Sequence, residues 1–146
     1  MYIKSDLWEV RTLESYLEYL NQLDLLISTP FESVFFIGDF NADPYTGRAW
    51  NNLSNFIHRN TLKCFDYDIL EPNTFTFISF GNTYCKWLDH IVGRETNNIS
   101  ITAVRVLYEV IGSDHLLLVS TIRVIANEPE IRIHANLHIR ENVQSM

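Results

Sequence analysis

The chain has 146 residues, of which 47% are hydrophobic and 13% aromatic, a length and apolar content typical of one globular domain and not of a disordered segment. Eleven lysines and arginines against 18 aspartates and glutamates give a net charge of -7, which argues against tight nucleic-acid binding through a basic face. A bound divalent cation would reverse the local field around such acids. The net charge is therefore only weak evidence for or against nucleic acid as a partner.

No apolar run reaches the roughly 18 residues that cross a bilayer, and the first residues lack the layout of a secretory signal. We therefore expect a soluble intracellular protein without a membrane partner, in either the nucleus or the cytoplasm. Cys64 and Cys85 show no C-x-x-C spacing, so we expect buried or idle thiols and no disulfide framework. The pair His134 and His138, at helical spacing, gives little support to a zinc site with these cysteines.

The first half of the chain predicts two helices and a strand between them. Apolar residues recur at threes and fours over residues 12–28, which predicts an amphipathic helix that begins at Thr12 and ends before Thr29-Pro30. A run of β-formers at residues 34–37 predicts a strand buried on both faces, and residues 49–59 predict a second, shorter helix.

Beyond residue 60, short β-prone segments predict neighbouring strands of one mixed sheet. These segments are residues 74–79, 86–92, 99–108 and 116–124. The tail at residues 126–146 alternates only weakly, and we expect a linker or a loosely docked strand there. The expected organisation is an α+β domain over residues 1–125, one mixed sheet with flanking helices, followed by this tail.

Asp39 and Asn41 follow the strand predicted at residues 34–37. A carboxylate and a carboxamide two residues apart project to the same side of an extended chain. Such a pair can bind a cation and a phosphate oxygen together. An ordinary turn is the alternative interpretation, because aspartate, asparagine and glycine all favour turns.

Asp114 and His115 lie directly before another apolar strand, where adjacent side chains point opposite ways and serve different partners. Asp114 suits a hard cation such as magnesium, whereas His115 suits proton handling or a hydrogen bond to phosphate. A turn acid and a surface histidine are the alternative interpretation of this pair.

Asp89 lies within a β-prone segment, where acids are depleted, so a polar group should face it. A carboxylate fixes the tautomer of a histidine in catalytic dyads, which makes His115 a natural partner for Asp89. A salt bridge from Asp89 to Lys86 or Arg94 is the alternative. His90 points to the opposite face and is expected to be structural.

Four motifs in a fixed order carry a family resemblance: FIGDFN at residues 36–41, TFTF at 74–77, WLDHI at 87–91 and GSDHL at 112–116. Together they resemble the endonuclease/exonuclease/phosphatase family. The amino-acid sequences of residues 38–42 and 85–89 are most similar to the endonuclease domain of non-LTR retrotransposons. The resemblance implies a fold that is half of the four-layer α/β sandwich of this family.

The resemblance also implies hydrolysis of phosphodiesters with Mg²⁺ or Mn²⁺, with DNA as the expected partner. Asp39 would orient or deprotonate the attacking water, and Asn41 would hold the scissile phosphate. Asp89 would brace His115, which would bind the phosphate and stabilise charge in the transition state. Asp114, together with Asp39, would ligate the metal.

The early motifs of the family have no match: a strand asparagine, a glutamate that is the principal metal ligand, and a tyrosine or histidine near the phosphate. The resemblance therefore implies the carboxyl-terminal half of the domain, incomplete as an isolated catalyst, through a truncated gene, a fragment or a mis-predicted start. An exposed half-sheet would invite self-association, so a non-catalytic remnant or interaction module is one alternative. A phosphatase of the same fold is the other.

Overall fold

The computed structural model describes residues 4–28, 32–81, 83–109 and 112–126, with side chains described from residue 13 onward. In chain order the elements are α1 (Lys4–Ile27), β1 (Val34–Asp39), α2 (Arg48–Arg59), β2 (Lys63–Cys64), α3 (Phe65–Ile69), β3 (Phe77–Ile78), β4 (Cys85–Lys86), β5 (Asp89–Arg94), β6 (Ile99–Leu107) and β7 (Leu117–Val124). The predicted tail lies outside the described residues from position 127 on, as does the histidine pair at 134 and 138. Over the described ranges, no helix combines the length and apolar character of a membrane span.

Within the described ranges, the strands form three antiparallel sheets. One has the order β1-β5-β2, a second pairs β3 with β4, and a third pairs β6 with β7. The expectation of one mixed sheet is therefore wrong, because the described strands pair as antiparallel neighbours within separate sheets. The α+β class with flanking helices is confirmed.

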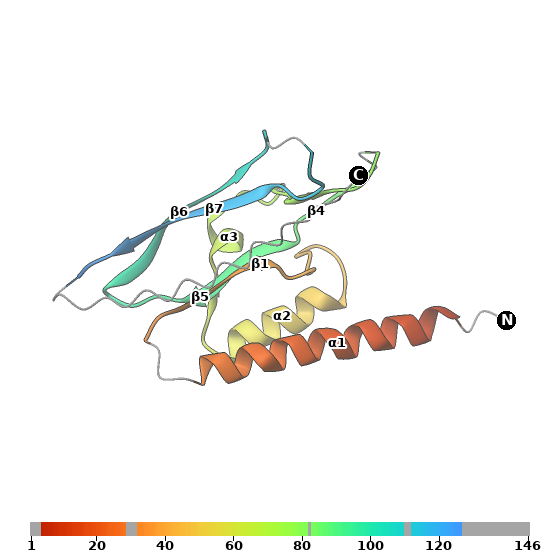
Figure 1. Ribbon diagram of the computed structural model, residues 1–146, viewed down its shortest axis with the longest axis horizontal. Coiled ribbons are helices and arrows are strands. Elements are labelled where there is room, and N and C mark those ends of the chain that lie inside the picture. Colours follow the sequence, from red (N-terminus) through yellow and green to blue (C-terminus); the bar gives the residue numbers. More distant parts are fainter. Residues whose placement is uncertain (1–3, 29–31, 82, 110–111, 127–146) are drawn as a thin grey trace, which may run out of the picture.

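Two hydrophobic cores lie on opposite faces of the β1-β5-β2 sheet (Figure 1). Helices α1 and α2 cover one face, and α3 with the β6–β7 hairpin covers the other. Side chains alternate along the central strand β5, so Val92 packs into the first core and Ile91 into the second. β5 is thus buried on both faces.

Helix α1 begins at Lys4 and not at Thr12, so the predicted start was wrong. Residues 4–11 contain neither glycine nor proline, and their leucine, glutamate and arginine are good helix formers, so nothing stops the helix from extending to Lys4. Its end at Ile27 agrees with the predicted stop, and α2 agrees with the predicted second helix.

The predicted strand at residues 34–37 is β1, but its burial on both faces was wrong. Among the described strands β1 pairs with β5 alone and lies at the edge of its sheet, and Ile37 is 53% exposed. An unbroken run of β-formers does not distinguish an edge strand from a central one. The short elements at residues 63–69, β2 and α3, were not predicted because neither is long enough to show a period.

Gly93 allows β1 to approach β5 closely. It lies opposite Phe35 in a register that also places Asp39 opposite Asp89. A Cβ atom at Gly93 would lie 2.3 Å from the carbonyl oxygen of Val34 and 3.0 Å from the Cα of Phe35. These are backbone atoms, so any larger residue would have to push the two strands apart.

We expect Gly93→Ala to lower the free energy of unfolding by about 2 kcal/mol or more, measured by urea denaturation. Thr121→Ala, at an exposed position of β7, is the control and should change it by less than about 0.5 kcal/mol. An equally small effect of Gly93→Ala would contradict the close approach of the two strands.

Candidate functional site

Two carboxylates face each other where β1 ends and β5 begins. Asp39 is the last residue of β1, Asp89 is the first of β5, and their Cα atoms are register partners. Like charges directly opposite each other in a strand pair are destabilising. A cation or a protonated group between the two side chains would offset this repulsion.

His115 provides a titratable ring at that place. Its Nδ1 lies 2.9 Å from Oδ2 of Asp89, and its Nε2 lies 3.9 Å from Oδ2 of Asp39. The predicted pairing of Asp89 with His115 is thus present in the structure. The ring is held in place by Phe77 of β3, whose ring centroid is 5.2 Å away and whose backbone forms a β-bridge with His115.

The surroundings of His115 favour its protonated form. Burial lowers the pKa of the ring, but the hydrogen bond to Asp89 and the negative charges of Asp89, Asp39 and Asp114 outweigh burial and raise the pKa above its ordinary value. Because Nδ1 donates to Asp89, a protonated ring presents its Nε2–H toward Asp39 and the solvent. That hydrogen is available to an anionic oxygen.

Asn41 holds the carboxylate of Asp39 through a turn. Its φ angle is 50°, a left-handed conformation that asparagine tolerates better than most residues. Its backbone amide donates to Oδ1 of Asp39 at 2.8 Å, and its side-chain Nδ2 donates to Oδ2 at 3.3 Å. The expected extended geometry was therefore wrong, although the two side chains do meet, because the chain turns back at Asn41.

Asp114 completes the group of five predicted residues. It is exposed, its carbonyl oxygen accepts from the amide of Ile78 at 2.8 Å, and its charge contributes to the raised pKa of His115. We call Asp39, Asn41, Asp89, Asp114 and His115 the rim residues. Their carboxylate and carboxamide oxygens are of the kind that magnesium prefers. Among the residues that the structure describes, however, the group of three potential ligand atoms within 4.8 Å of one another comes from Cys64, Asp66 and His90, and not from the acidic and histidine side chains of the rim.

Thr76 is a buried residue whose contribution the sequence did not reveal. Its Oγ1 accepts from the amides of Leu88 at 3.0 Å and Asp89 at 2.9 Å, and its carbonyl oxygen accepts from the amide of Leu116 at 2.7 Å. Thr76 thereby ties together the chain segments that carry Asp89 and His115. The TFTF motif marked the position, but a threonine between aromatic residues does not indicate which amides it binds.

A second polar cluster, Cys64, Asp66 and His90, is buried beneath the rim. One potential ligand atom from each residue lies within 4.8 Å of the others. Nδ1 of His90 is 2.7 Å from Oδ2 of Asp66, and the thiol of Cys64 donates to Oδ1 at 3.3 Å. Burial and the charge of Asp66 raise the pKa of the Cys64 thiol, which keeps it protonated. Cys64 is thus a buried free thiol, whereas Cys85 is a free thiol on the surface.

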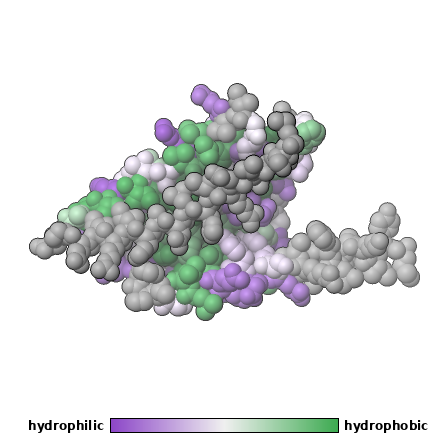
Figure 2. Space-filling model, viewed as in Figure 1, coloured by the Kyte–Doolittle hydropathy of each residue, from purple (hydrophilic) through white to green (hydrophobic). Residues whose placement is uncertain are grey.

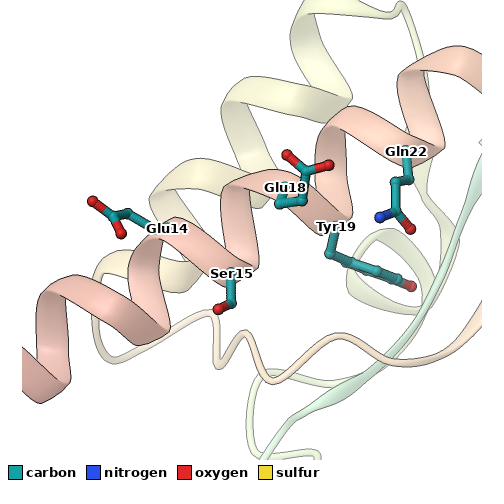
Figure 3. A pocket seen from close by; sticks show the side chains of 5 residues that line it. All are labelled: Glu14, Ser15, Glu18, Tyr19 and Gln22. Carbon is teal, nitrogen blue, oxygen red and sulfur yellow. The ribbon is translucent and has the colours of Figure 1, made fainter.

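A hollow along α1 does not involve the rim residues (Figure 3). Its lining consists of Glu14, Ser15, Glu18, Tyr19 and Gln22. Two glutamates make it unsuited to a phosphate. The ring of Tyr19 lies 6.1 Å, edge to face, from that of Phe40. Helix α1 therefore packs against the loop that follows β1.

One of the comparisons with known proteins, that with protein families, gives a match. The model of the endonuclease/exonuclease/phosphatase family matches residues 3–115, which is more than half of the chain and includes all five rim residues. The chain therefore belongs to the endonuclease/exonuclease/phosphatase family. Phosphodiester hydrolysis and dependence on a divalent metal are the general properties that this membership suggests. No curated protein and no solved structure matches the chain.

We expect an NMR titration to place the pKa of His115 above its ordinary value of 6.5. Asp89→Asn should lower that pKa, because it removes the charge that offsets burial. Asp68→Asn, which removes an exposed acid on α3, is the control and should leave the pKa of His115 unchanged, because Asp68 is not among the charges that raise it.

The same shift predicts how stability depends on pH. Because the pKa of His115 is higher in the folded than in the unfolded state, its stabilising contribution is complete below the unfolded pKa and is lost as pH rises through the folded pKa. The free energy of unfolding, measured from denaturation curves across that pH range, should fall less in Asp89→Asn than in the unmodified protein. Equal pH dependence in both proteins would contradict the coupling.

Proposed function

We propose that the chain hydrolyses phosphodiester bonds as a metal-dependent endonuclease acting on DNA, and that the rim residues form its active site. The observation that carries this proposal is the position of His115, 2.9 Å from one carboxylate and 3.9 Å from the other. Phosphodiester hydrolysis needs an activated water, a cation, and donors to the developing negative charge. The rim offers a candidate group for each need.

Each side chain has a distinct part in this reaction. Asp39, whose carboxylate is oriented by Asn41, accepts a proton from the attacking water or orients it. The Nε2–H of His115 donates to a phosphoryl oxygen, and Asp89 fixes the tautomer that makes this possible. Asn41 holds the phosphate. Asp39 and Asp114 would hold Mg²⁺ or Mn²⁺, which when bound polarises the phosphoryl group.

We further propose that the chain is related to the endonuclease domain of non-LTR retrotransposons, because the amino-acid sequences of residues 38–42 and 85–89 are typical of that group. The motifs that support this relation are those that come late in the family's order of motifs along the chain. The chain would then contribute the carboxyl-terminal half of the domain over residues 1–125, and the principal metal-binding glutamate would come from another segment.

An exposed aromatic hairpin favours nucleic acid over a small phosphate ester as the substrate. Phe80 is fully exposed in the loop between β3 and β4, and Nζ of Lys86 lies 5.6 Å from the centre of the exposed Tyr84 ring. Phe77 of the same hairpin touches His115. Nucleic-acid bases stack on such rings, whereas a small phosphate would leave them unused.

We expect Phe80→Ala to weaken DNA binding by about five- to 100-fold, the factor for one lost base stack, as measured by fluorescence anisotropy. Hydrolysis of bis-p-nitrophenyl phosphate, which has no nucleic-acid bases, should fall by a smaller factor than the DNA affinity. Leu25→Ala, an exposed apolar position on α1, is the control. Equal DNA affinity of the Phe80→Ala protein and the unmodified protein would contradict stacking.

The central test is nicking of supercoiled plasmid with and without magnesium. We expect Asp39→Ala, Asp114→Ala and His115→Ala to lower the nicking rate by about 10²- to 10⁴-fold, and EDTA to abolish it. Asp68→Ala removes an exposed acid on α3 and should leave the rate unchanged. Equal nicking by all variants would contradict catalysis at the rim, whereas no nicking by the unmodified chain would contradict activity of this chain without the segment that carries the glutamate.

An interaction module without catalysis is the second candidate, favoured by apolar residues exposed on and just after the β6–β7 hairpin (Figure 2). They are Leu117, Ile122, Val124 and Ile125. Ile122 and Val124 are two residues apart in β7 and therefore lie on one face of the strand, where they can be buried against a second copy of the chain. Dimerisation in sedimentation experiments, with no magnesium-dependent cleavage, would favour this function over the enzyme.

A further inference from the structure

The loop that carries Asn41 is anchored on both sides by the neighbours of Asp89. The amide of Phe40, before Asn41, donates to the carbonyl oxygen of Leu88 at 2.9 Å. The carbonyl oxygen of Ala42, after Asn41, lies 2.6 Å from Nε2 of His90. The first anchor continues the β1–β5 pairing, whereas the second depends on a side chain.

The ring of His90 is itself held in place by Asp66. Its Nδ1 lies at hydrogen-bond distance, 2.7 Å, from Oδ2 of Asp66, and Oδ1 of Asp66 accepts from the amide of Ile91 at 2.7 Å. The side chains of His90 and Asp66 are both fully buried. A carbonyl oxygen can only accept, so Nε2 of His90 must carry the hydrogen that binds Ala42.

Aromatic rings leave the imidazole little room to move. The ring of Trp50 lies 5.3 Å from that of His90, and the ring of Trp87 stacks on it at 6.1 Å with an interplanar angle of 28°. Phe40 closes a further side at 6.1 Å. A buried ring packed in this way links Asp66 to Ala42 without room for either to shift independently.

Hydrogen bonding explains this cluster better than a metal ion does. Two ligands about 2.0 Å from a tetrahedral zinc ion are separated by roughly 3.3 Å. The 2.7 Å between Nδ1 of His90 and Oδ2 of Asp66 is a hydrogen-bond length. Both oxygens of Asp66 already accept from donors within the protein.

We propose that His90 is a positioning residue for the rim: held by Asp66, it fixes Ala42 and thereby keeps Asn41 turned toward Asp39. The same segment that carries Asp89 thus sets where Asn41 lies. The role of Asn41 toward phosphate rests on the proposed function, but the anchoring itself does not.

Two variants separate the hydrogen bond to Ala42 from the bond to Asp66. In His90→Gln the side-chain amide reaches the position of Nε2 and can still donate to Ala42. In His90→Asn the shorter amide reaches Asp66 but leaves the buried carbonyl without a donor. His58→Asn, at an exposed position of α2, is the matched control.

The measurement is amide hydrogen exchange of Asn41, Tyr45 and Thr46, whose amides bond within the loop. We expect exchange about tenfold faster in His90→Asn, the factor for one lost buried hydrogen bond, with β6 and β7 unchanged. His90→Gln should restore rates close to those of the unmodified chain. None of these rates depends on catalysis, so they stay interpretable if plasmid nicking fails.

Three results would overturn the proposal. His90→Gln could exchange as fast as His90→Asn, or both could accelerate β6 and β7 as much as the loop, which would indicate general destabilisation. Zinc retained by the purified chain and lost in His90→Asn would indicate a metal centre instead. Should His90→Asn not fold, the unmodified protein still provides a test, because its Nε2 proton must give an NMR signal protected from solvent.

Discussion

The antiparallel pairing of β1 with β5 is the constraint on which the rest of the structure depends. Its register places Asp39 opposite Asp89, and the close approach at Gly93 keeps the two strands together at the other end. A slip of one residue would turn every side chain of β1 to the opposite face. The rim and both cores would then be lost together.

Two carboxylates at one strand end create an electrostatic cost that the fold resolves with a histidine. His115 comes from a distant part of the chain and binds Asp89 while it faces Asp39. Its raised pKa follows from the same charges. In the proposed reaction, a divalent cation bound among these negative charges would reverse the local field that an anionic substrate meets.

The buried layer beneath the rim gives the site its rigidity. Thr76 satisfies the amides of Leu88 and Asp89, while His90 satisfies the carbonyl of Ala42. These polar groups have their bonds inside the protein, so a displacement of the loop would leave one of them unpaired and buried. The surface carboxylates are thereby positioned by groups that never meet the solvent.

The sequence by itself determined the helix α2, the end of α1 and the family, because periodicity and short motifs are local properties of the chain. It left open whether Asp89 binds His115 or one of the cations Lys86 and Arg94, and the tertiary structure decided for His115, which is 26 positions away. Only the tertiary structure decided the three separate sheets, the left-handed turn at Asn41 and the bond from His90 to Ala42. That bond joins residues 48 positions apart, and such a contact exists only after the β1–β5 pairing has formed.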